Sequence, residues 1–315
     1  MEHTIERMTL AGTVKAWVTL SRPPFHTVGV FPFFLGTVLA WRFDNVFNLP
    51  LFILGTVAVI FIMLSTYYGG EYADVMEDKL SASMDRNAFS GGTQVVIKNL
   101  LPRHHAHIAS YVALALTVIT GLIIQFGYNT GPLTIPLGIA GILAGFFYSM
   151  MPIRWVTRGV GEIIIGFSYG WLPVAVSYYL QTGTIHSIIH LMSVPIACTV
   201  FNIILINEFP DHPADVIAKK SNLVVRFGKE RSAVIYIIMH LIGIAGYVLS
   251  VMQGLPVSAL LYYAPVGIIC LALCVMMGAK KYADKKLLEL MCALTIVTNL
   301  GSALAYILAL AFMRS

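Results

Sequence analysis

The chain has 315 residues, of which 58% are hydrophobic and only 11% are charged, and its formal net charge is +5. Its mean hydropathy is +0.81. Soluble domains carry about 25% charged residues, so this composition excludes an ordinary soluble enzyme and indicates a membrane protein. The basic residues are scattered among loops without an RNA-binding aromatic motif, so we expect no nucleic-acid partner.

Nine apolar stretches are long enough to cross a bilayer, which takes roughly 20 helical residues. They cover residues 25–43, 51–69, 106–127, 132–150, 160–180, 185–206, 232–252, 258–278 and 288–312. We expect each stretch to be helical, because backbone polar groups in lipid must find hydrogen-bond partners within the segment. The predicted fold class is therefore an all-α, polytopic membrane protein.

The positions of Lys and Arg test this layout independently. With nine spans, the N-terminus and the loops after the second, fourth, sixth and eighth spans lie on one side of the membrane. That side receives 18 of the 20 Lys and Arg, and only Arg42 and Arg314 fall on the other. The positive-inside rule then predicts a cytoplasmic N-terminus and an external C-terminus.

The two longest loops, 70–105 and 207–231, both lie on the predicted cytoplasmic side. Each follows an even-numbered span, four spans apart, and each begins with acidic residues and ends with basic ones. This pattern predicts two four-helix halves plus one extra helix. No linker divides the chain, so we expect one integral domain over residues 1–315.

The first long loop opens with carboxylates at helical spacing. Glu71, Asp74 and Asp78 are spaced i, i+3 and i+7. On a helix this spacing places them within about 60° of one another, so all three project from one face. Crowded carboxylates beside an apolar span repel one another and lose hydration, and such groups indicate a functional site.

The second long loop repeats the pattern. Asp211 and Asp215 are spaced i and i+4, and Asn207 lies one turn earlier. Pro210 and Pro213 argue against an ordinary helix here, because proline removes backbone hydrogen bonds. Two facing clusters of hard oxygen ligands would suit Mg²⁺, which completes its shell with water and substrate phosphate.

Basic residues near the two clusters are candidates to neutralise a diphosphate. They are Arg86, Lys219, Lys220 and Arg226. The alternative is that the acids are solvated loop residues that merely oppose loop bases. The occurrence of two clusters at equivalent positions favours the functional interpretation.

Four ordered motifs resemble the UbiA-type intramembrane prenyltransferases, in particular the branch that acts on dihydroxynaphthoate and related quinone precursors. The resemblance covers nearly the whole chain. It rests on Arg22-Pro23 with Phe31–Thr37, on Glu71–Asp78 with Ser90-Gly91-Gly92, on Phe147–Glu162, and on Asn207–Asp215 with Lys220 and Leu223–Gly228.

This resemblance implies helices around a central cavity and Mg²⁺-dependent transfer of a prenyl group from a prenyl diphosphate to an aromatic acceptor. It implies catalysis by Asp74, Asp78, Asp211 and Asp215, and metal binding by these four and Glu71. Diphosphate binding would fall to Arg22, Arg86, Tyr148, Arg154, Asn207, Lys220 and Arg226.

The chain departs from the family pattern at two places. The first motif usually begins with Asn-Asp, where this chain has Gly70 and Glu71, and Lys219 stands where the dihydroxynaphthoate branch usually has Gly. Glu can still bind Mg²⁺, but the loss of the Asn leaves substrate choice open.

Two other functions compete with aromatic prenyl transfer. A terpene cyclase would use the same scaffold without an acceptor, and an ion-coupled transporter would also place acids within a helical bundle. Transporters tend to place charges near the membrane midplane, whereas these acids cluster at one face. Acceptor identity, prenyl chain length and oligomeric state are not determined by the sequence.

Overall fold

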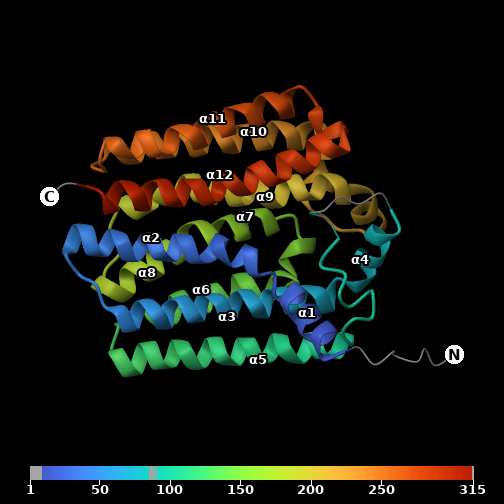
Figure 1. Ribbon diagram of the computed structural model, residues 1–315, viewed down its shortest axis with the longest axis horizontal. Coiled ribbons are helices and arrows are strands. Elements are labelled where there is room, and N and C mark those ends of the chain that lie inside the picture. Colours follow the sequence, from blue (N-terminus) through green and yellow to red (C-terminus); the bar gives the residue numbers. More distant parts are fainter. Residues whose placement is uncertain (1–8, 85–88, 90, 314–315) are drawn as a thin grey trace.

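The computed structural model describes residues 9–84, 89 and 91–313. These residues form helices that are joined by turns and loops (Figure 1). The helices are α1 (Leu10–Ser21), α2 (Thr27–Asp44), α3 (Leu49–Ala73), α4 (Val75–Ala82), α5 (Arg103–Leu122), α6 (Thr134–Gly145), α7 (Gly161–Gly166), α8 (Leu172–Thr182), α9 (Ile188–Ile217), α10 (Leu223–Met252), α11 (Ser258–Gly278) and α12 (Lys285–Ala311).

Among the described residues, eight helical stretches are long and apolar enough to cross a membrane. They are Leu10–Asp44, Leu49–Ala73, Arg103–Gly127, Gly161–Thr182, Ile188–Ile217, Leu223–Met252, Ser258–Gly278 and Lys285–Ala311. The fourth predicted span, 132–150, coincides instead with a shorter apolar helix, Thr134–Tyr148. This helix starts late because Gly131, at a φ of 98°, and Pro132 form a turn that precedes it.

Most long helices run side by side along the molecule (Figure 1), and hydrogen bonds between helices join several of the polar groups that they bury. Here α9 packs against α10 and α12, α3 against α5, and α2 against α8. Tyr236 on α10 and Thr295 on α12 share a hydrogen bond of 2.6 Å, and Asn299 Nδ2 donates to Thr199 Oγ1 at 3.1 Å. Such pairs satisfy polar groups that lipid cannot hydrate.

One expectation about the second acidic cluster was wrong. Helix α9 continues through Pro210 and Pro213 and ends only at Ile217. Each proline removes a single backbone donor, and the helix is held across this region by the packing of buried Phe209 and Ala214. The second cluster therefore lies on the last turns of a long helix and not in a loop.

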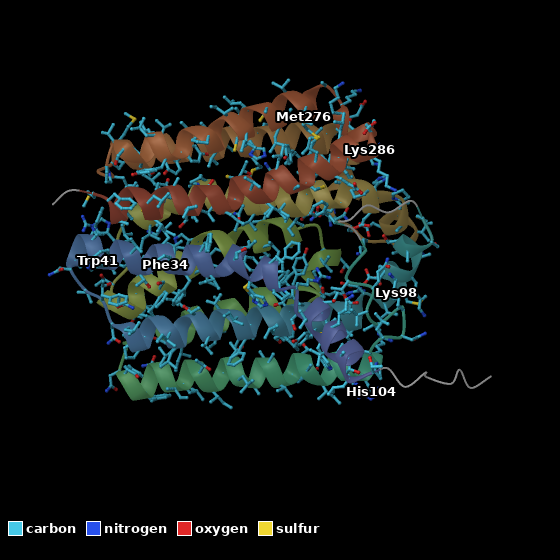
Figure 2. All side chains as sticks on the ribbon, in the orientation of Figure 1. Phe34, Trp41, Lys98, His104, Met276 and Lys286 are labelled. Carbon is cyan, nitrogen blue, oxygen red and sulfur yellow. The ribbon has the colours of Figure 1, made fainter. Side chains whose placement is uncertain are left out.

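The polar elements gather at one end of the bundle. Figure 1 shows α1, α4 and the end of α9 together at this end, opposite the end of α12. Figure 2 shows Lys98, His104 and Lys286 at the same end and Trp41 at the other. The end that carries the acidic clusters is thus also the end that carries most of the basic residues.

Candidate active site

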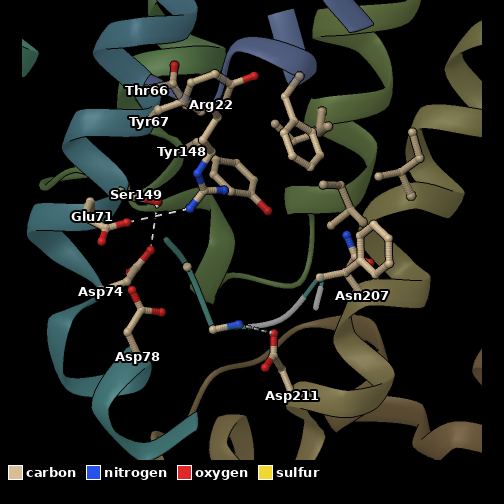
Figure 3. A pocket seen from close by; sticks show the side chains of 18 of the residues that line it. Arg22, Thr66, Tyr67, Glu71, Asp74, Asp78, Tyr148, Ser149, Asn207 and Asp211 are labelled. Carbon is tan, nitrogen blue, oxygen red and sulfur yellow. Dashed lines mark hydrogen bonds and ion pairs between the residues drawn. The ribbon is translucent and has the colours of Figure 1, made fainter. Parts of the chain in front are cut away.

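A cavity of about 290 Å³ lies where α3, α4 and α9 meet at the polar end. Figure 3 shows Glu71, Asp74 and Asp78 on one wall and Asn207 and Asp211 on the opposite wall. The predicted site residues that line it are Arg22, Glu71, Asp74, Asp78, Tyr148, Asn207, Asp211, Asp215 and Lys220. Two clusters far apart in the sequence therefore share one cavity.

The first cluster keeps its common face across a helix junction. Helix α3 ends at Ala73 and α4 begins at Val75, and Asp74 between them has a φ of −95° and a ψ of 18°. The backbone hydrogen bond from Asp78 N to Asp74 O, at 2.8 Å, bridges the junction. The acidic face therefore continues from α3 into α4, and its side chains point into the cavity.

Two groups from the 149–160 loop hold Asp74 in place. Ser149 Oγ donates to Asp74 Oδ2 at 3.1 Å, and Arg154 Nη2 donates to Asp74 Oδ1 at 2.7 Å. The same nitrogen of Arg154 also donates to Glu77 Oε1 at 2.7 Å. Burial alone would lower the pKa of Arg154, but its hydrogen bonds to Asp74 and Glu77 raise it. Arg154 is therefore a fixed cation behind the first cluster.

Glu71 is directed towards backbone donors of the loop that follows α4. Its Oε2 accepts from Thr93 N at 3.1 Å and its Oε1 from Val96 N at 3.4 Å. Arg22 Nη2 lies 3.7 Å from the same carboxylate, which is 3% exposed. Glu71 thus ties the 91–96 segment and Arg22 to the wall of the cavity.

Asp211 makes the direct contact between the two acidic segments. Ser81 Oγ on α4 donates to Asp211 Oδ1 at 2.9 Å. Gly91 N, in the loop after α4, lies 3.4 Å from Asp211 Oδ2. The neighbouring Gly92 has a φ of 63°, and a Cβ there would lie 2.4 Å from Asp78 Oδ2. Glycine suits this position because its φ is in the left-handed region, and the absence of a Cβ leaves room for the Asp78 carboxylate.

Asp215 is held by the segment that leads into α10. Lys220 Nζ lies 3.2 Å from Asp215 Oδ1, and Asn222 Nδ2 donates to Asp215 Oδ2 at 2.7 Å. Asn222 also caps α10 by accepting from Val225 N at 2.9 Å. The same helix start is held by Glu162 Oε1, which accepts from Leu223 N at 2.8 Å. The second cluster and the start of α10 therefore form one hydrogen-bonded unit.

The cavity carries an excess of negative charge. Burial and, after it, the nearby carboxylates of Glu71 and Asp74 raise the pKa of Asp78 to about 7, against the opposing effect of Lys220 and Arg22. Burial alone would lower the pKa of Lys220, but Asp74 and Asp215 outweigh it and raise this pKa. Such a site favours a bound cation.

The donor set suits a magnesium ion that brings ligands of its own. Within the described ranges, no three His, Cys, Asp or Glu side chains lie close enough together to hold a metal by themselves. Mg²⁺ typically takes one or two carboxylates and completes its shell with water and phosphate oxygens. Asn207 Oδ1 is buried and has no hydrogen-bond partner, so one further oxygen acceptor is available at the wall.

Two predicted residues take other places. Arg226 Nη2 donates to Arg158 O at 2.8 Å, so its guanidinium lies on the 158–159 turn and not in the cavity lining. Arg154 contacts the site through Asp74 and Glu77. Arg86 lies outside the described residues.

The sequence interpretation missed three residues that the structure brings to the site. Glu77 and Ser81 line the cavity, and Ser149 binds Asp74. A signal was available for Ser81, which is spaced i+7 from Asp74 and i+3 from Asp78 and therefore shares their helical face. Glu77 is spaced i+3 from Asp74, so helical spacing offered a signal for it as well. No such signal pointed to Ser149, because its role depends on where the 149–160 loop packs.

Known proteins resemble the chain in sequence. The UbiA prenyltransferase family model matches residues 29–297. The 1,4-dihydroxy-2-naphthoate octaprenyltransferase of Bacillus subtilis (strain 168) is 27% identical over 213 residues, which cover 66% of this chain and 65% of that protein. The 2-carboxy-1,4-naphthoquinone phytyltransferase of Synechocystis sp. is 25% identical over 224 residues, which cover 70% of this chain and 68% of that protein. The chain thus spans just under two thirds of the Bacillus protein.

Solved structures share the fold. A UbiA homolog from Aeropyrum pernix K1 superposes with a TM-score of 0.67 at 16% identity and covers 88% of this chain and 96% of its own. A UbiA homolog from Archaeoglobus fulgidus, bound to GPP and Mg²⁺, superposes with a TM-score of 0.63 at 13% identity and covers 90% and 99%. Together with the eight long apolar helices found among the described residues, the family match identifies an integral, multi-pass membrane protein. The chain belongs to the UbiA prenyltransferase family.

Proposed function

We propose that the chain transfers a prenyl group from an isoprenyl diphosphate to an aromatic acceptor of the dihydroxynaphthoate class, within the membrane and with Mg²⁺, releasing diphosphate. The observation that carries the proposal is that both acidic clusters line one cavity. A hydrogen bond from Ser81 on α4 to Asp211 on α9 joins the two segments. The naphthoate acceptor is supported by the naphthoate prenyltransferases and phytyltransferase to which the chain is similar.

The four aspartates Asp74, Asp78, Asp211 and Asp215 would hold magnesium. Bound there, the metal supplies positive charge that stabilises the leaving diphosphate. Glu71 would contribute a further carboxylate to this metal site, and its two oxygens also hold the 91–96 segment by accepting hydrogen bonds from backbone amides.

The basic and amide groups of the cavity would bind the diphosphate itself. Asn207 lines the cavity, where its Nδ2 would donate to a diphosphate oxygen and its Oδ1 is left for the metal. Lys220 and Arg22 line the same cavity, and Lys220 lies beside the second cluster and Arg22 beside the first. These cations would stabilise the charge that develops as the bond between the prenyl carbon and the diphosphate oxygen breaks. The electron pair leaves with diphosphate, and a carbon of the acceptor ring attacks the allylic cation. That ring carbon then loses its proton to solvent, or its carboxylate as CO2, and the bonding pair restores the aromatic ring.

Tyr148 lines the same cavity and would contact the substrate. Arg154 would act on the site by orienting Asp74. Arg226, in the first turn of α10, would act by stabilising the 158–159 turn through its hydrogen bond to Arg158 O. Arg86 stays a sequence-based candidate for diphosphate binding.

We place a ninth crossing at Thr134–Tyr148. Helix α1 lies at the acidic end of the bundle and α12 ends at the opposite end (Figure 1). A chain that starts at one end and finishes at the other crosses the bundle an odd number of times, so a ninth crossing is needed beside the eight long helices found among the described residues. With the positive-inside rule, this layout puts the N-terminus and the active site at the cytoplasmic face. The nine helices would form two four-helix halves plus one, in a single domain around the cavity.

The test is a reaction of purified protein in detergent with Mg²⁺, prenyl diphosphates of increasing length and 1,4-dihydroxy-2-naphthoate, run with and without the acceptor. A prenylated naphthalene formed only with acceptor and Mg²⁺ is the expected product. Cyclised hydrocarbon without acceptor would replace the proposal by terpene cyclisation. Absence of any diphosphate release would favour a non-enzymatic role such as transport.

A further inference from the structure

The chain at the start of helix α10 is a short segment with a break in the helical backbone on each side. Before it, Lys219 has a φ of 55°, which is in the left-handed region. At its end, Gly228 has a φ of 76° and a ψ of 163°, which interrupts the regular helix. Because helical backbone continues through neither residue, the position of residues 220–227 depends on the contacts that they make. We call this stretch the 220–227 segment.

Two residues of the 220–227 segment belong to the site. Lys220 lines the acidic cavity, and its Nζ lies 3.2 Å from Asp215 Oδ1. Asn222 Nδ2 donates to Asp215 Oδ2 at 2.7 Å. A shift of the segment would therefore move a cation that is proposed to bind diphosphate, together with a donor that holds a proposed magnesium ligand.

Two buried glutamates hold the backbone of this segment. Glu162 on α7 is 2% exposed, and its Oε1 accepts from Leu223 N at 2.8 Å. Glu208 on α9 is 9% exposed, and its Oε2 accepts from Val224 N at a longer distance of 3.4 Å. A carboxylate that accepts from a backbone N–H at the start of a helix makes one of the stronger hydrogen bonds in proteins. Neither glutamate lines the acidic cavity, so we expect both to act through the segment and not by contact with the substrate.

One stretch of chain, residues 149–162, contacts both sides of the site. Near its start, Arg154 Nη2 donates to Asp74 Oδ1 of the first cluster at 2.7 Å. Further along, Arg158 O accepts from a guanidinium nitrogen of the 220–227 segment at 2.8 Å. At its end, Glu162 holds the backbone of the same segment. Residues 149–162 therefore join the first acidic cluster to the segment that holds the second.

Building on the proposed prenyl transfer, we infer that Glu162 is a positioning residue for the diphosphate site. Its hydrogen bond to the start of α10 fixes Lys220 towards the bound diphosphate and Asp215 towards magnesium. Because residues 149–162 are also bonded to Asp74, the same stretch sets the position of one acidic cluster relative to the other. Glu162 supplies an oxygen that accepts a hydrogen bond, and this role requires neither its charge nor contact with the substrate.

Three variants separate this role from that of an ordinary helix cap. Glu162→Ala removes the acceptor. Glu162→Gln keeps a carbonyl oxygen for Leu223 N, and its amide can donate to Glu208, whose carboxyl hydrogen-bonds with that of Glu162. Asp284→Ala is the matched control, because exposed Asp284 caps another spanning helix, α12, through the same kind of bond, accepting from Leu287 N at 2.9 Å.

Steady-state kinetics give the first readout. In Glu162→Ala we expect KM for the prenyl diphosphate to rise roughly tenfold or more, which is the factor for one buried hydrogen bond to a charged group, while KM for the acceptor stays unchanged. Glu162→Gln should keep KM for the prenyl diphosphate close to that of the unaltered protein. Asp284→Ala should lower the melting temperature without changing either KM.

Hydrogen–deuterium exchange gives a second readout that does not depend on activity. The amides of residues 220–227 should exchange faster in Glu162→Ala than in the unaltered protein, and at the unaltered rate in Glu162→Gln. Where Glu162→Ala does not fold, Leu223→Pro removes the same hydrogen bond from the donor side. Leu223 is the first residue of α10, a position at which proline is tolerated, so this variant should raise KM for the prenyl diphosphate in the same way.

An unchanged KM for the prenyl diphosphate in folded Glu162→Ala or Leu223→Pro would overturn the inference. So would a Glu162→Gln protein that is as impaired as Glu162→Ala, because the charge of Glu162 and not its hydrogen bond would then matter. Both results leave prenyl transfer itself standing. If the unaltered protein transfers no prenyl group, the proposed function fails first, and the inference fails with it.

Discussion

Replacing Ser81 by Ala tests the contact on which the convergence of the two acidic clusters depends. Ser81 is 6% exposed, and its hydroxyl donates to Asp211 Oδ1 at 2.9 Å across α4 and α9. The hydroxyl orients the carboxylate and favours its charged form. Alanine removes this donor and only one heavy atom, so the helices should keep their packing.

The size of the effect follows from the type of hydrogen bond. A hydrogen bond to a charged group contributes about 1.5–3 kcal/mol net when it is buried, as this one is. If that free energy holds Asp211 in position for metal and diphosphate, its loss weakens binding by roughly 10- to 150-fold. We expect the Mg²⁺ concentration for half-maximal prenyl transfer to rise within that range.

The assay is a Mg²⁺ titration of prenyl transfer at saturating prenyl diphosphate, with the thermal midpoint measured in the same detergent. Ser83→Ala is the matched control, because Ser83 is exposed near the end of the same helix and its hydroxyl donates only to Leu80 O. A Ser81→Ala protein that is as stable as the control and has the same Mg²⁺ dependence would refute the reasoning.

Three further outcomes follow from the site. Asp74→Asn or Asp215→Asn should reduce kcat by about 100-fold or more, because a metal-binding charge is lost, and full prenyl transfer by either variant in detergent would contradict the metal assignment. Arg154→Gln should lower the free energy of unfolding, measured in thermal melts, by about 1–3 kcal/mol; this figure allows for the partial exposure of the Arg154 ion pair. Arg158→Gln is the control and should change the free energy of unfolding little, because the Arg158 side chain donates to carbonyls of its own loop. The pKa of Asp78 is raised from 3.8 to about 7, so the folded protein favours the protonated carboxyl. Without metal, Asp78 therefore contributes its full share to the free energy of unfolding below pH 3.8, and this share is lost as the pH rises through 7. Magnesium should therefore raise the melting temperature more at pH 8 than at pH 5.5, and equal effects at both pH values would contradict this.

Much of the architecture could be inferred before any coordinates, because crossing a bilayer imposes a length and a composition on each helix separately. Eight of the nine expected stretches, such as 51–69 within α3 and 258–278 within α11, coincide with helices of spanning length. The acidic face of Glu71, Asp74 and Asp78 could be anticipated for the same reason, since helical periodicity is a local property.

The partners of those side chains were decided by the packing of segments far apart in the chain. Ser81 and Asp211 are separated by 130 residues, and Arg154 and Asp74 by 80. No local pattern could show that Arg154 would bind a carboxylate, or that Arg226 would lie on a turn outside the cavity. A hydrogen bond between distant residues depends on the distance and angle between two packed helices, whereas hydropathy and helical spacing depend only on neighbours along the chain.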